Sequence, residues 1–179
     1  VIPEGRGTAT ESDDQAPRYS PSRVASAGRT AKEKAIAHEE HASIMSRRVL
    51  VTGGSRGIGR AIAIHAAAAG FDVTLSYRSQ ASAAEDVVRS IEAKGGAARA
   101  IALDVSDRDT TRAVLEAEIA AHGAFYGAVC NAGIHADAPF PGMSREQWHR
   151  VIDVSLHGFY NVTRPLVMPM VRARWGRIV

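Results

Sequence analysis

The feature that most constrains this chain is the glycine-rich stretch Thr-Gly-Gly-Ser-Arg-Gly-Ile-Gly-Arg at residues 52–60. The apolar run Val49-Leu50-Val51 before it predicts a buried strand, and the alanine-rich residues 61–69 after it predict a helix that ends at Gly70. The first amides of a helix have no partner inside the helix, so a strand, a glycine turn and a helix in this order form an anion-binding corner. The sequence therefore predicts a phosphate-binding turn here.

The three spaced glycines of this turn are expected to do different work. We expect Gly53 to turn the chain off the strand, Gly57 to let the backbone approach a pyrophosphate, and Gly59 to let the helix pack closely. The candidate cofactor-binding residues of this stretch are Gly53, Ser55, Arg56, Gly57, Ile58 and Gly59.

Strands and helices alternate along the rest of the chain. Strands are predicted over residues 71–77, 98–105 and 126–130, and residues 177–179 resemble the opening of a fifth. Helical spacing separates them, with Ser106 and Ser144 as predicted N-caps and Gly95 and Gly123 as predicted stops. This order predicts an α/β fold with a doubly wound parallel sheet, a Rossmann fold, which we expect to be incomplete on its C-terminal side.

The long helix after Ser144 carries apolar residues at helical spacing, and Pro165 and Pro169 are expected to bend it. The apolar positions of this predicted stripe are Trp148, Val151, Ile152, Leu156, Phe159, Val162, Leu166 and Val171.

Polar corners follow three of the predicted strands. They are the glycine turn, the pair Asp104-Val105, and the triplet Asn131-Ala132-Gly133. Because the carboxyl ends of parallel strands meet at one edge of a sheet, we expect these corners to converge on one ligand. The sequence therefore predicts a dinucleotide site.

The end of the second strand indicates which dinucleotide is bound. NAD-preferring versions of this fold carry an acidic residue about twenty positions past the glycines. Here the strand ends in Tyr77-Arg78-Ser79, and Asp72 lies at its other end. Arg78 and Arg56 can each pair with a 2′-phosphate, so we expect NADPH or NADP as the cofactor.

Residues 1–45 differ in composition from the rest. Large apolar side chains are too sparse there to offset the ordering entropy, which predicts a disordered tail or an upstream or fusion remnant, with Met45 as the natural start. A functional tail is the alternative. His38 and His41 stand three residues apart rather than the four of a metalloprotease helix, so we expect no metal site. Residues 46–179 are the predicted dinucleotide-binding domain.

Overall composition excludes several classes of function. The formal net charge of +3 is spread along the chain without a dense basic block, which argues against nucleic-acid binding. The one cysteine, Cys130, forms no internal disulfide and fits a reducing cytoplasm. The longest apolar stretches are too short for a membrane span. We expect a cytoplasmic protein without a membrane partner.

The motifs resemble those of the short-chain dehydrogenase/reductase family. Residues 52–59 match its Thr-Gly-x-x-x-Gly-x-Gly loop, Asp104-Val105 its adenine-side aspartate, and residues 131–133 its Asn-Ala-Gly turn. Residues 158–162, Gly-Phe-Tyr-Asn-Val, with Met168-Pro169-Met170, look most like bacterial 3-oxoacyl-[acyl-carrier-protein] reductases. The resemblance covers residues 48–179.

This resemblance implies NADPH-dependent reduction of a 3-oxoacyl thioester, as in fatty acid biosynthesis, by a homodimeric or homotetrameric parent enzyme. The family's serine and Tyr-x-x-x-Lys pair lie beyond the fifth strand, and none of the four tyrosines here has a lysine four residues later. We therefore expect this chain to supply the cofactor-binding part and to be inactive alone. Ser155 stands at the family's catalytic asparagine position, where a water relay or a bond to a helix carbonyl are both open.

Two other functions stay open at this stage. Ser155 and the missing pair suit a non-catalytic nucleotide-binding partner of an active homologue, and a sugar, steroid or alcohol could replace the thioester. Cys130 is interpreted as a small buried residue rather than a nucleophile. His135 and Asp137 are expected to line the mouth of the cleft.

Overall fold

The computed structural model describes residues 47–179, so the predicted tail, Met45, His38 and His41 lie outside the described residues. Its centre is a parallel sheet of five strands in the order β3-β2-β1-β4-β5. The predicted doubly wound parallel sheet is confirmed. The strands are β1 (Arg48–Val51), β2 (Asp72–Tyr77), β3 (Ala98–Ala102), β4 (Gly127–Val129) and β5 (Arg177–Ile178).

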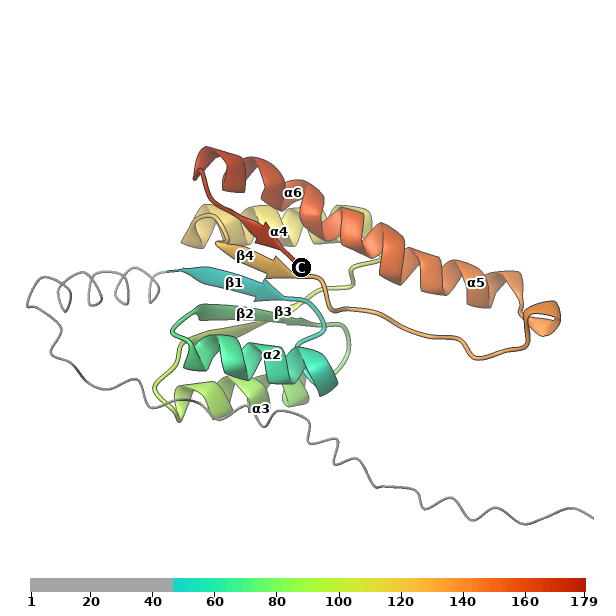
Figure 1. Ribbon diagram of the computed structural model, residues 1–179, viewed down its shortest axis with the longest axis horizontal. Helices are drawn as coiled ribbons and strands as arrows, with labels where there is room; N and C mark the ends of the chain where they lie inside the picture. The colour runs from blue at the N-terminus through green and yellow to red at the C-terminus, as the bar shows by residue number, and fades with distance from the viewer. Residues whose placement is uncertain (1–46) are drawn as a thin grey trace, which may run out of the picture.

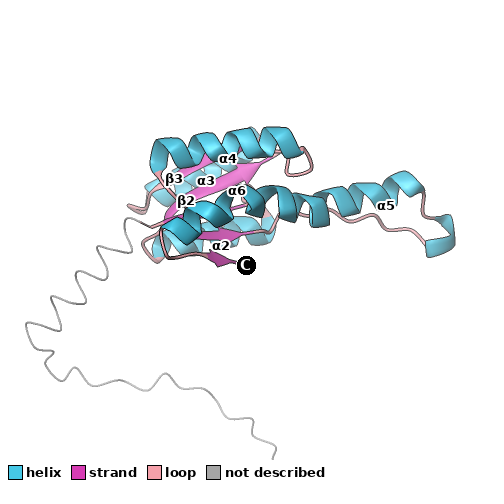
Figure 2. Cartoon of the chain, turned by 90° about the horizontal axis from the view of Figure 1, so that it is seen from above, coloured by secondary structure: helices cyan, strands magenta, loops and turns pink. Residues whose placement is uncertain are grey.

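Helices cover both faces of this sheet (Figure 1). Helices α2 (Gly57–Ala68) and α3 (Ala81–Glu92) pack on one face, and α4 (Arg108–His122) and α6 (Gly158–Arg172) on the other. Figure 2 shows α5 (Arg145–Ile152) extending beyond the edge of the sheet. The short helix η1 (Phe140–Gly142) precedes α5, and a π-helical turn, η2 (Asp153–His157), joins α5 to α6. No helix among residues 47–179 is long and apolar enough to cross a membrane.

The alternation of side chains along β1 explains why the chain forms two cores. Val49 and Val51 point into the core beneath α2 and α3, whereas Leu50 points into the core beneath α4 and α6. A strand that is buried on both faces needs a continuous apolar run, which is the pattern of residues 49–51. The central position of β1 follows from this run.

Several predicted boundaries were wrong by a few residues. The third strand ends at Ala102 rather than at residue 105. The Leu103 amide makes the last hydrogen bond to β2, with the Tyr77 carbonyl, and the chain then leaves β2. The N-cap of α4 is Asp107 rather than Ser106. The Asp107 carboxylate accepts from the Thr110 amide, while Ser106 donates to Asp104. The predicted capping box of Ser144 with Gln147 is confirmed.

The predicted apolar stripe of the long helix was wrong in part. Val162 and Leu166 are buried, but so are Val154 and Met170, which the spacing did not predict. Val162, Leu166 and Met170 recur every four residues on one face of α6. Val154 lies within the π-helical turn itself, where the Gly158 amide donates to the carbonyl of Asp153, five residues back. Large apolar side chains that are exposed instead are Trp148, Leu156, Phe159 and Val171.

A buried ion pair closes the end of the sheet where the strands begin. The Arg48 guanidinium is 2.7 Å from the Glu118 carboxylate, and it also donates to the Gly123 carbonyl at 2.9 Å. It lies 4.3 Å from the centre of the Phe125 ring. Burial lowers the pKa of Arg48, and the attraction of Glu118 opposes that shift. The carboxylate is therefore what keeps a buried cation compatible with the core.

Replacing Glu118 should destabilise the domain strongly. In Glu118→Ala the Arg48 charge stays buried without its partner, so we expect the free energy of unfolding to fall by about 3–5 kcal/mol. Urea titration followed by circular dichroism measures this. Asp86→Ala is the matched control, because Asp86 pairs with Arg89 on the exposed surface of α3, where ion pairs contribute about 0–1 kcal/mol. Equal losses in the two variants would contradict a structural role for the buried pair.

Candidate functional site

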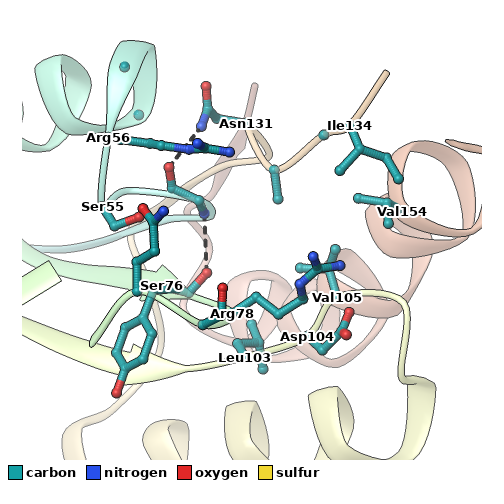
Figure 3. Close-up of a pocket in the computed structure, with 18 of the residues that line it drawn as sticks. Ser55, Arg56, Ser76, Arg78, Leu103, Asp104, Val105, Asn131, Ile134 and Val154 are labelled. Carbon is teal, nitrogen blue, oxygen red and sulfur yellow. Dashed lines mark hydrogen bonds between the residues drawn. The ribbon is translucent and has the colours of Figure 1, made fainter. Parts of the chain in front are cut away.

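A cavity of about 340 Å³ lies where β1, β2 and β4 end (Figure 3). All twelve residues that the sequence predicts for cofactor binding line it, and they come from the glycine turn, the end of β2, the segment after β3 and the segment after β4. The expected convergence of the three polar corners is therefore what the structure shows. The twelve residues are Gly53, Ser55, Arg56, Gly57, Ile58, Gly59, Arg78, Asp104, Val105, Asn131, Ala132 and Gly133.

Hydrogen bonds join the glycine turn to the segment after β4. The side-chain amide of Asn131 donates to the carbonyls of Thr52 and Gly53, at 2.9 and 3.3 Å. The Ala132 amide donates to the Thr52 hydroxyl at 2.9 Å. The two segments therefore form one wall of the cavity, held together by the side-chain amide of Asn131 and the hydroxyl of Thr52.

The N-terminus of α2 opens onto this cavity. Arg56 occupies the N-cap position and no side chain caps the helix, so the first amides remain available to an anion. Gly59 permits this arrangement, because a Cβ atom there would lie 2.4 Å from the Gly53 carbonyl oxygen and 2.5 Å from Asn131 Nδ2. Gly59 therefore allows a close approach of α2 to the glycine turn and Asn131.

Three charged residues line the cavity, two of them basic. Figure 3 shows Arg56 and Arg78 entering from different walls. Asp104 accepts from the amide and the hydroxyl of Ser106 at 3.0 and 2.6 Å, both on Oδ1. Asp72 begins β2, far from these residues, and pairs with Arg99 at 3.9 Å. The strand tip therefore offers a cation where an NAD site would offer a carboxylate.

Sequence reasoning missed seven lining residues. Ser76 is the most informative, because its hydroxyl accepts from the Gly53 amide at 3.3 Å and its carbonyl from the Gly54 amide at 2.8 Å. Its place beside the predicted strand tip could have indicated it, whereas Val154 comes from the long helix and carries no local signal. The full set is Ser76, Tyr77, Ser79, Gln80, Leu103, Ile134 and Val154.

Ser155 lies outside this cavity and lines a second one of about 130 Å³. Val105, Ala132 and Val154 line both, so the two cavities adjoin. Ser155 is exposed, so the water relay and the bond to a helix carbonyl both stay predictions for it. The hydroxyl is exposed and available to water.

The remaining candidate residues do not form a catalytic group. Burial raises the pKa of the half-buried Cys130 thiol, which disfavours the reactive thiolate. His135 and Asp137 are 3.7 Å apart and almost fully exposed, and they follow Ile134, which lines the cavity; their place at its mouth stays a prediction. The described residues hold no group of three or more side chains suited to a metal ion.

Comparison with known proteins identifies the family. The family model for short chain dehydrogenases matches residues 47–179, which is nearly three quarters of the sequence and every described residue. The chain belongs to the short-chain dehydrogenase family. Curated relatives include a 3-oxoacyl-[acyl-carrier-protein] reductase of Aggregatibacter actinomycetemcomitans, 48% identical over 136 residues that are 75% of this chain and 56% of that protein.

Other relatives of the family carry different names. A 3beta-hydroxysteroid dehydrogenase of Eggerthella lenta is 40% identical over 65% of this chain and 45% of its own length. A metagenomic short-chain oxidoreductase crystallised with NADP has a TM-score of 0.73 and 35% identity, over 76% of this chain and 62% of its own. A gluconate 5-dehydrogenase from Burkholderia cenocepacia J2315 in complex with NADP and tartrate has a TM-score of 0.69 and 33% identity, over 74% and 51%. The chain spans about half the length of the curated relatives it matches.

Adding one methyl group at Gly59 should distort the family's glycine turn. Because the new Cβ would overlap the Gly53 carbonyl and Asn131, we expect Gly59→Ala to lower the free energy of unfolding by about 1–3 kcal/mol. The measurement is urea denaturation. Gly142→Ala is the control, since a Cβ there has open space and its stability should change by less than about 0.5 kcal/mol. An unchanged Gly59→Ala variant would show that the turn relaxes freely.

Proposed function

We propose that this chain is the cofactor-binding part of an NADPH-dependent 3-oxoacyl-thioester reductase. The observation that carries the proposal is the single cavity in which helix amides, two arginines and Asp104 face one another, with no carboxylate at the tip of β2. Two similar structures were solved with NADP, and the 48% identical relative is named for acyl-carrier-protein substrates. These similarities support the cofactor and the substrate class together.

Each part of the cavity suits one part of the dinucleotide. The uncapped start of α2 suits the pyrophosphate, because its amides and the helix dipole favour an anion. Arg78 and Arg56 suit the 2′-phosphate, which a guanidinium binds through paired hydrogen bonds. Asp104 suits the adenine amine, since Ser106 occupies only one of its carboxylate oxygens.

The chemistry divides between the cofactor and the protein. The nicotinamide supplies a hydride when bound. Ser155, exposed in the adjoining cavity, can hold a water molecule on the path of the proton. Proton donation in this family is assigned to a tyrosine with a lysine four residues later, a pair that residues 1–179 lack. We therefore expect binding without turnover from this chain alone.

The long helix suits self-association of the parent enzyme. Exposed large apolar side chains gather along η2 and α6, where an unpartnered surface of this kind indicates an interface. We propose that this surface pairs with a second copy in a homodimer or homotetramer. Its members are Leu156, Phe159, Tyr160, Val167, Met168 and Val171.

Two alternatives have support of their own. The steroid and gluconate dehydrogenases among the similar proteins favour a hydroxysteroid, sugar acid or simple alcohol in place of the thioester. The serine at position 155 favours a nucleotide-binding partner that does not catalyse. Rates of an active form on an acetoacetyl thioester, a hydroxysteroid and a sugar acid distinguish the first alternative from the proposed substrate. Activity of a chain that is completed with the family's proton donor distinguishes the second.

Reversing the charge of Arg78 should alter cofactor preference. We expect Arg78→Asp to weaken NADPH binding by about 30-fold or more while NADH changes little, because the aspartate repels a 2′-phosphate and can accept from ribose hydroxyls. Isothermal titration of both cofactors measures the change. Arg112→Asp, on the exposed surface of α4, makes the same charge change and should leave both affinities unaltered. Equal losses for NADPH and NADH in Arg78→Asp would remove Arg78 from the phosphate site.

Activity should require the family's proton donor. The chain alone should leave NADPH unoxidised in the presence of an acetoacetyl thioester. Residues 47–179 joined at β5 to the remaining C-terminal part of the Aggregatibacter reductase should oxidise it. In that chimera Ser155→Asn should raise kcat by about fivefold, because an amide offers both a donor and an acceptor to the water. A chimera that folds and binds NADPH but reduces no thioester would favour the non-catalytic alternative.

A further inference from the structure

The segment after β3 is held from two helices at once. The Asp104 carbonyl accepts from the Thr111 hydroxyl of α4 at 3.0 Å, and Thr111 is fully buried. The next carbonyl, that of Val105, accepts from the side-chain amide of Asn161 on α6 at 2.9 Å. Two successive peptide groups are therefore fixed, one on each side of the Val105 Cα atom, and the Val105 backbone has little freedom to rotate.

Asn161 is well placed to act on this segment. Its side chain is 6% exposed, and 56 residues of sequence separate it from Val105. Gly158, one turn earlier, allows the close approach, because a Cβ atom there would lie 2.8 Å from Val105 Cγ2. Burying the polar Asn161 side chain costs desolvation, which its hydrogen bond to the distant Val105 carbonyl offsets.

The fixed segment presents a matched donor and acceptor to the cavity. Among residues 47–179 the Val105 amide has no backbone or side-chain partner, and Asp104 Oδ2 accepts no hydrogen bond. Both residues line the cavity. One N–H beside one carboxylate oxygen complements the edge of adenine, which offers a ring-nitrogen acceptor beside an amine donor. Reading that edge requires the two groups to hold their relative orientation.

We infer that Asn161 is a positioning residue: by holding the Val105 carbonyl, while Thr111 holds the Asp104 carbonyl, it keeps the Asp104–Val105 segment in the orientation that selects adenine in the dinucleotide. This inference rests on the proposed cofactor site and adds a residue that touches no part of the cofactor. The long helix, which also carries the proposed self-association surface, then contributes to base recognition through one hydrogen bond.

The test compares NADPH with its hypoxanthine analogue, in which a carbonyl replaces the adenine amine and the ring nitrogen carries a proton. This change reverses the donor and acceptor, so the wild-type chain should bind NADPH at least about tenfold more tightly. Asn161→Leu, of similar volume, should lose most of that ratio, because the segment is then held only on the Asp104 side, through Thr111, and its carboxylate and N–H lose their fixed relative orientation. Asn161→Ser, with a shorter side chain that cannot reach, should lose it as well. Isothermal titration gives both dissociation constants.

The ratio separates positioning from simple loss of structure. A partly unfolded variant weakens both ligands by the same factor, so its ratio stays at the wild-type value. Thr163→Val is the matched control, because Thr163 is also buried on α6 but its hydroxyl bonds Phe159 of its own helix at 2.8 Å. It should keep the full ratio.

Three results would overturn the inference about Asn161. A wild-type ratio in both Asn161 variants would overturn the inference while leaving the cofactor site intact. A wild-type chain that binds both ligands equally would also overturn it, because the segment would then not read the base. A wild-type chain that binds neither would overturn the proposed cofactor site as well.

Discussion

The cavity depends on the hydrogen bonds that Thr52 and Gly53 share with Asn131 and Ala132. A glycine turn alone has several accessible conformations, and its carbonyls would otherwise need water. The Asn131 amide satisfies two of them and fixes the turn against the end of β4. Gly59 then has to pass within contact distance of the same side chain, which leaves no room for a Cβ atom. These contacts therefore hold the glycine turn, the start of α2 and the end of β4 in one arrangement. A change in the conformation of any one of them would break hydrogen bonds or cause a clash with the other two.

Polar groups are paired differently at the two ends of the sheet. Where the strands begin, charged and aromatic side chains pair with one another within the protein, although among residues 47–179 the buried Arg48 Nε has no hydrogen-bond partner. Arg48 is paired in the core, and the Tyr126 and Trp175 rings stack with centroids 4.9 Å apart beneath Arg47 and Arg177. Where the strands end, Arg56, Arg78 and Val105 line the cavity, and no side chain caps the start of α2. The paired groups where the strands begin act as a scaffold, and the groups where the strands finish are free to bind a ligand. This is the usual division between scaffold and site.

The sequence predicted the sheet and the twelve cavity residues because both follow from short local patterns. The apolar run at residues 49–51, followed at once by the glycine turn, suits a strand buried on both faces, and the polar corners fall at strand ends that topology brings together. Contacts that depend on helix phase were beyond such patterns. Val154, which lines the cavity, lies within the π-helical turn, and Asn161, which follows the turn on α6, bonds the Val105 carbonyl; no residue type signals that turn. The sequence could not distinguish Asp107 from Ser106 as the N-cap of α4, because serine and aspartate have similar N-cap propensity. In the structure the Ser106 hydroxyl donates to Asp104 instead, and Asp107 caps the helix.

Because of the π-helical turn at Asp153–His157, the packing of α6 depends on the number of residues in this connection more than on which residues they are. An α-helix advances by about 100° for each residue, so a five-residue turn of π-helix displaces every later side chain by roughly that angle. Removing a single residue between Ile152 and Gly158 would restore a regular helix and carry Asn161 and Leu166 away from the faces they occupy. Substitutions here can be compensated by neighbours, but a change in length cannot. The number of residues between α5 and α6 therefore determines which side chains of α6 face the sheet.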